Sequence, residues 1–142
     1  MDPDPAKLTT VVRPVLEQLA RDYNATITQA LPTMLEVLPP NCSKLRGVEE
    51  LCKQLSKTST TTASSSSDVE NDDDDDLILV EDHVLALGDA ENDMELLKKA
   101  SIGVAMGNAS PPAQDAADFV MTETNNEGGA GAALQVFLFG QY

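Results

Sequence analysis

Two segments in the first 56 residues repeat apolar side chains at the spacing of an amphipathic α-helix. They cover residues 8–23 and 43–56, and in each the polar side chains fall on the opposite face. Pro14 has no backbone N–H, so it is tolerated only in the first turn of a helix. The first helix is therefore predicted to begin near Arg13, after a frayed start at residues 1–7.

Between these helices, two short segments have β-strand character. Residues 25–30 alternate weakly, residues 34–38 are strongly β-like, and Pro32 lies in the connection. Two such runs separated by a short proline-containing turn predict an antiparallel hairpin. Pro39 and Pro40 end the second strand.

From residue 77 onward, the pattern alternates between short apolar runs and helical spacing. Because alternating strands and helices are typical of a parallel sheet covered by helices, this part predicts an α/β domain. The predicted strands are residues 84–87, 102–106 and 119–121, and the predicted helices are residues 94–100, 111–117 and 132–138.

Residues 57–76 separate these two parts and have neither periodicity nor apolar content. Ser and Thr come first and an aspartate run follows, and seven of the 24 acidic residues lie between Asp68 and Asp76. Such a segment cannot bury a core, so it is predicted to be a disordered insertion. It lacks the spaced ligands and the turn glycine of a calcium-binding loop.

The net charge of −15 argues against electrostatic binding to nucleic acid or to an anionic membrane. No apolar run approaches the roughly 20 residues that a membrane helix needs. Cys42 and Cys52 are too few for a disulfide framework, and the proline-broken acidic N-terminus is not a signal peptide. These features favour a reduced, cytoplasmic location, although an N-terminal truncation would remove targeting information.

The chemistry-bearing stretch is Gly88-Asp-Ala-Glu-Asn-Asp93, which follows a buried apolar run and precedes a helix. A carboxylate at Asp89 would face the crevice beyond the strand ends, where ligands bind in open α/β sheets. Mg²⁺ takes oxygen ligands, often one or two carboxylates together with a substrate phosphate. On spacing alone, however, Asp89, Asn92 and Asp93 fit a turn and a helix cap equally well.

The surrounding motifs extend the pattern beyond this loop. Together they resemble the C-terminal part of the haloacid dehalogenase superfamily, and more narrowly the Cof-type sugar-phosphate phosphatases. The segments that carry the resemblance are Leu35-Glu-Val-Leu-Pro39, Ser43-Lys44, Gly88 to Asp93, Ile102-Gly-Val-Ala-Met-Gly-Asn-Ala109, Ala116-Ala-Asp118 and Asn126-Glu-Gly128.

The resemblance implies a Mg²⁺-dependent phosphomonoesterase acting on a small phosphorylated metabolite. In that family an aspartate attacks phosphorus, and water hydrolyses the resulting aspartyl-phosphate. Carried over, Asp89 would bind Mg²⁺, while Asp93 would support the metal shell or the lysine. Lys44 and Asn92 would contact the phosphoryl group, and Asn108 would support the site.

The resemblance also implies a missing part, because the family's strand followed by Asp-x-Asp-Gly-Thr is not found. Asp2-Pro-Asp4 has the spacing but no preceding strand, so no catalytic nucleophile is assigned. We therefore expect a partial Rossmann-type sheet with exposed apolar edges, together with a remnant of an α+β cap. We also expect the chain to be inactive alone and to be completed by an N-terminal fragment. The expected divisions are a cap remnant (1–42), a returning helix (43–56), the insertion (57–76) and half of the core (77–142).

Two alternatives remain open on the sequence. The chain could be a non-enzymatic module whose acidic tract binds basic partners or divalent ions, or it could be a truncated gene product.

Overall fold

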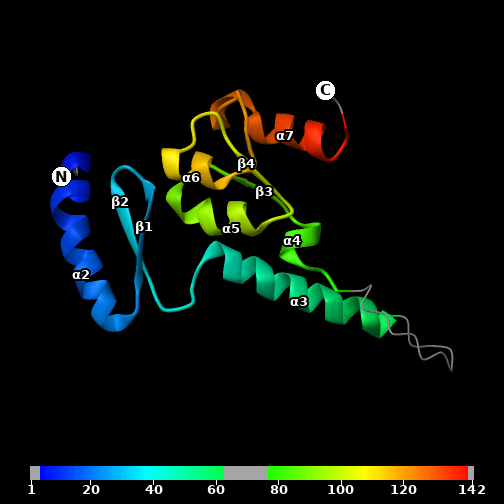
Figure 1. The fold of residues 1–142 in the computed structure, drawn as a ribbon, viewed down its shortest axis with the longest axis horizontal. Coiled ribbons are helices and arrows are strands. Elements are labelled where there is room, and N and C mark those ends of the chain that lie inside the picture. Colours follow the sequence, from blue (N-terminus) through cyan, green and yellow to red (C-terminus); the bar gives the residue numbers. More distant parts are fainter. Residues whose placement is uncertain (1–3, 63–76, 141–142) are drawn as a thin grey trace.

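The computed structural model describes residues 4–62 and 77–140, arranged as an N-terminal unit, a long connecting helix and a C-terminal α/β unit (Figure 1). The N-terminal unit starts with α1 (Pro5–Lys7), the π-helical η1 (Leu8–Val12) and α2 (Arg13–Tyr23), which follow one another without a break. Helix α2 starts at Arg13, as predicted, but Pro14 follows residues that are already helical and does not lie in the first turn of the helical segment.

The prediction of a frayed start is wrong for residues 5–7, which are already helical. The wider π-helical turn of η1 directly precedes Pro14, and the N–H of Arg13 donates to the carbonyl of Leu8. Such turns relieve the loss of an α-helical hydrogen bond, so the proline does not stop the chain from being helical before it.

The predicted hairpin is present as β1 (Thr26–Leu31) and β2 (Met34–Leu38), which pair antiparallel. Asn24 ends α2 in the left-handed conformation (φ 53°), which reverses the chain into β1. The hairpin lies beside α2 (Figure 1) and buries Ile27 and Thr28.

The connecting helix α3 (Lys44–Thr62) runs from the hairpin toward the end of the molecule that carries α4 (Figure 1). It continues past residue 56, so the expected start of the disordered insertion at residue 57 differs from the structure, and residues 63–76 lie outside the described part. Near this end of α3, the Ser56 hydroxyl accepts a hydrogen bond from the N–H of Ile78 and fastens the following segment to the helix.

The C-terminal unit is an α/β layer structure, which confirms the predicted fold class. A parallel sheet has the order β3-β4-β5, so β3 is an edge strand. The elements are α4 (Val80–His83), β3 (Leu85–Gly88), η3 (Glu91–Asp93), α5 (Met94–Lys99), β4 (Ile102–Ala105), α6 (Pro111–Ala116), β5 (Phe119–Val120), η4 (Asn125–Glu127) and α7 (Gly129–Phe137).

Small apolar clusters pack on both faces of this sheet. Leu97 of α5 and Ala113 of α6 pack on one face, and Ala133 of α7 packs against Val104 on the other. The sheet nevertheless leaves apolar surface open, because Phe119 and Val120 of β5 are each 50% exposed. Exposed apolar side chains on a sheet edge were expected for a partial sheet.

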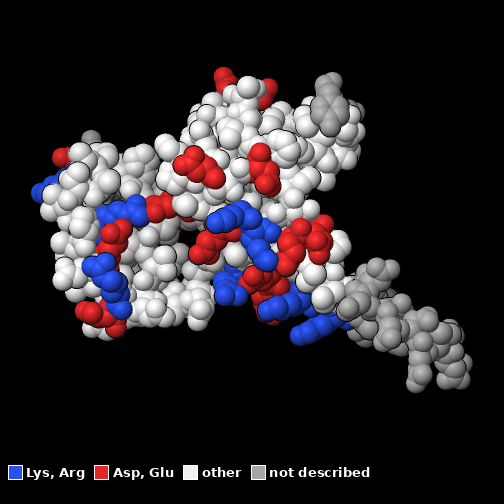
Figure 2. Space-filling view, in the orientation of Figure 1, with Lys and Arg blue, Asp and Glu red and all other residues white. Residues whose placement is uncertain are grey.

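Figure 2 shows basic and acidic side chains close to one another across the middle of the molecule, and a hollow between the N-terminal unit and the C-terminal unit. Within residues 4–62 and 77–140, no helix is both long and apolar enough to cross a lipid bilayer.

Candidate phosphate and metal site

The loop after β3 is folded around the carboxylate of Asp93. Asp93 Oδ2 accepts hydrogen bonds from the backbone N–H groups of Asp89 and Ala90, both at 3.0 Å, and this closes the turn that leads into η3. A Cβ atom at Gly88 would lie 2.5 Å from the Asp93 Cβ, so the close approach requires glycine. The turn therefore fixes the direction of the chain from β3 into η3.

Lys44 reaches this loop from the first turn of α3. Its Nζ lies 2.6 Å from Asp93 Oδ1, and Asp93 is only 5% exposed. A carboxylate removed from water needs a partner for its charge, and Lys44 supplies it. The pair joins two segments 49 residues apart in the sequence, so Asp93 fastens the start of α3 to the loop after β3.

Asp89 lies directly beyond the end of β3 and is half-buried. Its Oδ2 accepts a hydrogen bond from Asn125 Nδ2 at 2.8 Å. The Oδ1 of Asn108 accepts from the N–H of Asn125 at 2.9 Å, so Asn108 acts on Asp89 through Asn125. Asn125 was not predicted from the sequence, although it directly precedes the Asn126-Glu-Gly128 segment.

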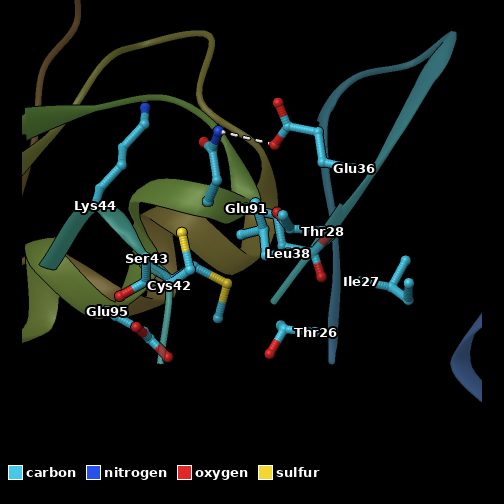
Figure 3. Close-up of a pocket in the computed structure, with 12 residues that line it drawn as sticks. Thr26, Ile27, Thr28, Glu36, Leu38, Cys42, Ser43, Lys44, Glu91 and Glu95 are labelled. Atoms are coloured by element: carbon cyan, nitrogen blue, oxygen red, sulfur yellow. Dashed lines mark hydrogen bonds between the residues drawn. The ribbon is translucent and has the colours of Figure 1, made fainter. Parts of the chain in front are cut away.

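Asn92 faces the hairpin rather than the Asp89 side of the loop. Its Nδ2 donates to Glu36 Oε2 of β2 over 3.4 Å, drawn as the dashed line in Figure 3. Its Oδ1 is buried and has no hydrogen-bond partner among the described residues. Glu36, like Asn125, was not expected to belong to the site.

Two cavities divide the predicted site residues. The first, about 510 Å³, lies between the hairpin and the start of α3 and is lined by Lys44 and Asn92. The second, about 610 Å³, is lined by Asp89 and Asn108. Glu91 lines both cavities, so the two cavities adjoin at the loop from Asp89 to Asp93.

Glu91 also holds the N-terminal unit on this loop. The Arg13 guanidinium donates to both of its carboxylate oxygens, at 2.8 and 2.5 Å, and the N–H of Gln29 donates to Oε2 at 3.1 Å. Hydrogen bonds to Glu91 first, and to Glu17 second, raise the pKa of Arg13 further above its ordinary value. We call this Arg13–Glu91–Gln29 contact the latch. It could not be predicted from local sequence patterns because its partners lie up to 78 residues apart.

The loop offers few ligands for a metal ion. Among the described residues, no group of three or more His, Cys, Asp or Glu side chains lies close enough to hold one. Both oxygens of Asp93 are engaged by Lys44 and by the two N–H groups. Within this loop, Asp89 is the carboxylate that could serve as a ligand of Mg²⁺, which often takes only one or two protein carboxylates and completes its shell with water and phosphate.

Comparisons with known proteins bear on this arrangement. The family model described as haloacid dehalogenase-like hydrolase matches residues 76–134, which contain the whole loop from Asp89 to Asp93. A 5-amino-6-(5-phospho-D-ribitylamino)uracil phosphatase from Bacillus subtilis, YcsE, is 30% identical over 85% of this chain and 39% of its own length. The chloroplastic endoribonuclease YBEY of Arabidopsis thaliana is 30% identical over 93% of this chain but only 18% of its own length.

A solved structure of similar fold is a HAD/COF-like hydrolase from Plasmodium vivax. It has a TM-score of 0.67 and 24% identity, and the match covers 97% of this chain and 40% of that one. The chain thus spans less than half the length of each of these relatives. The matched segment, the phosphatase relative and the fold show that the chain belongs to the haloacid dehalogenase superfamily.

Proposed function

We propose that this chain provides the phosphate- and magnesium-binding part of a Cof-type phosphatase that hydrolyses a small phosphomonoester. The observation that carries the proposal is the 2.6 Å pair between Lys44 and Asp93, which brings a cation to the loop after β3. Phosphoryl transfer depends mostly on positioning and charge stabilisation. A lysine held by a buried carboxylate beside that loop meets this need.

Asp89 is the proposed metal ligand. It follows the strand end directly, and Asn125 fixes one of its oxygens. The contacts of Asp93 support this role for Asp89, because the Asp93 oxygens already accept hydrogen bonds that close the turn and bind Lys44. Mg²⁺ bound at Asp89 would neutralise charge on the phosphoryl oxygens.

Lys44 and Asn92 are the proposed contacts to the phosphoryl group, and both line the same cavity. The Lys44 ammonium acts as a point charge against phosphate oxygens, while the Asn92 amide donates from Nδ2. Asn108 has a supporting role, because it holds Asn125 and through it Asp89.

The attacking carboxylate is proposed to come from a segment outside the described residues. Asp4 does not fit the role, because its side chain accepts the N–H of Ala6 and caps α1. An edge strand such as β3 can accept a further strand. A complementing N-terminal portion that added a strand beside β3 would bring its own strand end next to Asp89, so the chain alone is predicted to be inactive.

The proposed substrate is a phosphorylated sugar or sugar alcohol of metabolite size. The name of the Bacillus subtilis relative, which is a phosphatase of a phosphoribityl compound, supports this class. The proposed compartment is the cytoplasm, in line with the two cysteines, which are both free thiols.

Turnover of p-nitrophenyl phosphate tests the proposal. The 142-residue chain alone should show no Mg²⁺-dependent activity. A chimera that joins the preceding part of the Bacillus subtilis phosphatase to this chain should be active, and Asp89→Asn should abolish that activity. A chimera that is folded by circular dichroism but inactive, or activity that survives Asp89→Asn, would contradict it.

A further inference from the structure

The cavity between the hairpin and α3 has two different walls. Lys44 comes from the first turn of α3, whereas Glu36 and Thr28 come from the two strands of the hairpin, and Figure 3 shows Lys44 and Glu36 on opposite sides. Its volume of about 510 Å³ is in the range of small-molecule sites. A ligand with a phosphoryl group at Lys44 would therefore extend its remaining part toward the hairpin.

The charges around this cavity disfavour a second anionic group on such a ligand. Three carboxylates line it, from Glu36, Glu91 and Glu95, against the single cation of Lys44. Lys44 is already paired with Asp93, and the charge of Glu91 is met by Arg13. A carboxylate placed near Glu36 would meet a like charge without compensation.

The hairpin side instead offers hydrogen-bond acceptors. Glu36 Oε2 makes only a long 3.4 Å contact to Asn92. The oxygens Thr28 Oγ1 and Asn92 Oδ1 are buried without a hydrogen-bond partner among the described residues, and Thr28 is 5% exposed. Buried polar atoms are normally paired, so these two oxygens leave unused hydrogen-bonding capacity beside the cavity.

We propose that this cavity binds the neutral, hydroxyl-bearing carbon chain of a phosphomonoester, and that Glu36 is a specificity-determining residue that accepts a hydrogen bond from a substrate hydroxyl. The proposal rests on the proposed function for its phosphate side only. Thr28 contributes a second hydroxyl contact, and the apolar side chains of Leu38 and Met94 lie against the carbon atoms. The site rejects substrates whose organic part ends in a carboxylate.

Isothermal titration calorimetry on the 142-residue chain with Mg²⁺ tests this with three probes. Ribitol 5-phosphate carries neutral hydroxyls, phosphoglycolate carries a carboxylate, and inorganic phosphate carries neither. Ribitol 5-phosphate should bind at least about tenfold more tightly than phosphoglycolate, since a hydrogen bond to a charged acceptor is worth about one decade in affinity.

Glu36→Gln should reduce this preference, because it should lower the affinity for ribitol 5-phosphate and raise the affinity for phosphoglycolate. The affinity for inorganic phosphate should not change. Glu50→Gln removes the same charge from an exposed position of α3 outside the cavity and should leave the preference intact. Thr28→Val, which keeps the side-chain shape, should weaken ribitol 5-phosphate alone.

The two proposals fail in different ways. Equal binding of ribitol 5-phosphate and phosphoglycolate by the unmodified chain would overturn the specificity proposal, even if inorganic phosphate still binds and Lys44→Met weakens it. Absence of any binding of all three probes would instead overturn the proposed function and the specificity proposal together.

Discussion

The latch between Arg13 and Glu91 is predicted to hold the hairpin unit against the loop from Asp89 to Asp93. Arg13 makes two hydrogen bonds to the Glu91 carboxylate, and Gln29 adds a third from its backbone. The Arg13 and Glu91 side chains are 22% and 27% exposed, so water screens the pair only in part. Loss of this contact should therefore loosen the hairpin before it loosens the sheet.

The size of the effect follows from the geometry of the pair. Hydrogen bonds to charged groups contribute about 1.5–3 kcal/mol when buried, and exposed ion pairs contribute about 0.2–1 kcal/mol. For a bidentate pair of intermediate exposure, we expect a coupling energy of about 1–2 kcal/mol, reduced by added salt.

A double-mutant cycle with Arg13→Met and Glu91→Gln measures this coupling by urea unfolding, and hydrogen exchange reports which part loosens. Methionine keeps the apolar stem of Arg13, and glutamine keeps the shape of Glu91. Amides of β1 should exchange faster in the single mutants, while amides of β4 should change less.

The matched control is the exposed pair of Arg46 and Glu49, three residues apart on α3, where the Arg46 side chain is 59% exposed. Its cycle, with the same types of substitution, should give about 0.3–0.5 kcal/mol. A latch coupling no larger than that of the control, or equal loosening of β1 and β4, would refute the inference that the latch fastens the hairpin.

Three further predictions concern Gly88, Lys44 and Glu127. Gly88→Ala should cost about 1–3 kcal/mol in unfolding free energy, since the new methyl group would overlap the Asp93 side chain, and chemical denaturation that finds no loss would contradict the close packing. Lys44→Met should lower the free energy of unfolding by about 1 kcal/mol, a small value because the lysine side chain is 52% exposed to water. A variant more stable than the unmodified chain would show that the buried Asp93 carboxylate does not need the cation. The N–H of Thr124 donates to the Glu127 carboxylate, and this hydrogen bond lowers the pKa of Glu127 below its ordinary value. The contribution of Glu127 to stability should therefore be present above the unfolded-state pKa and be lost as the pH falls through the folded-state pKa. A carbon-13 NMR titration of Glu127 with a midpoint at or above the ordinary pKa would exclude this.

The secondary structure was largely predictable because it depends on local patterns. The hairpin and the parallel strands follow from periodicity and from turn residues. The extension of α3 to Thr62 was not predictable, since its last residues are Ser and Thr, which have low helix propensity. Their helical state follows from the preceding turns of α3, not from their own pattern.

The site was predictable only where a motif supplied it. The resemblance pointed to Lys44 and Asp93, and the structure brings them together. Glu36 and Asn125 were missed because their roles depend on contacts between distant segments, which leave no periodic signal. The sequence also could not indicate that Lys44 and Asp89 line two different cavities.

The most direct test of the central claim is a nitrogen-15 NMR titration of the chain with inorganic phosphate in the presence of Mg²⁺. We expect saturable shifts confined to the amides around Lys44 and from Asp89 to Asp93, with affinity at least about tenfold weaker in Asp89→Asn because the metal ligand is lost. Shifts scattered over the surface, or identical titrations for the chain and Asp89→Asn, would contradict the assignment of this loop as a phosphate and magnesium site.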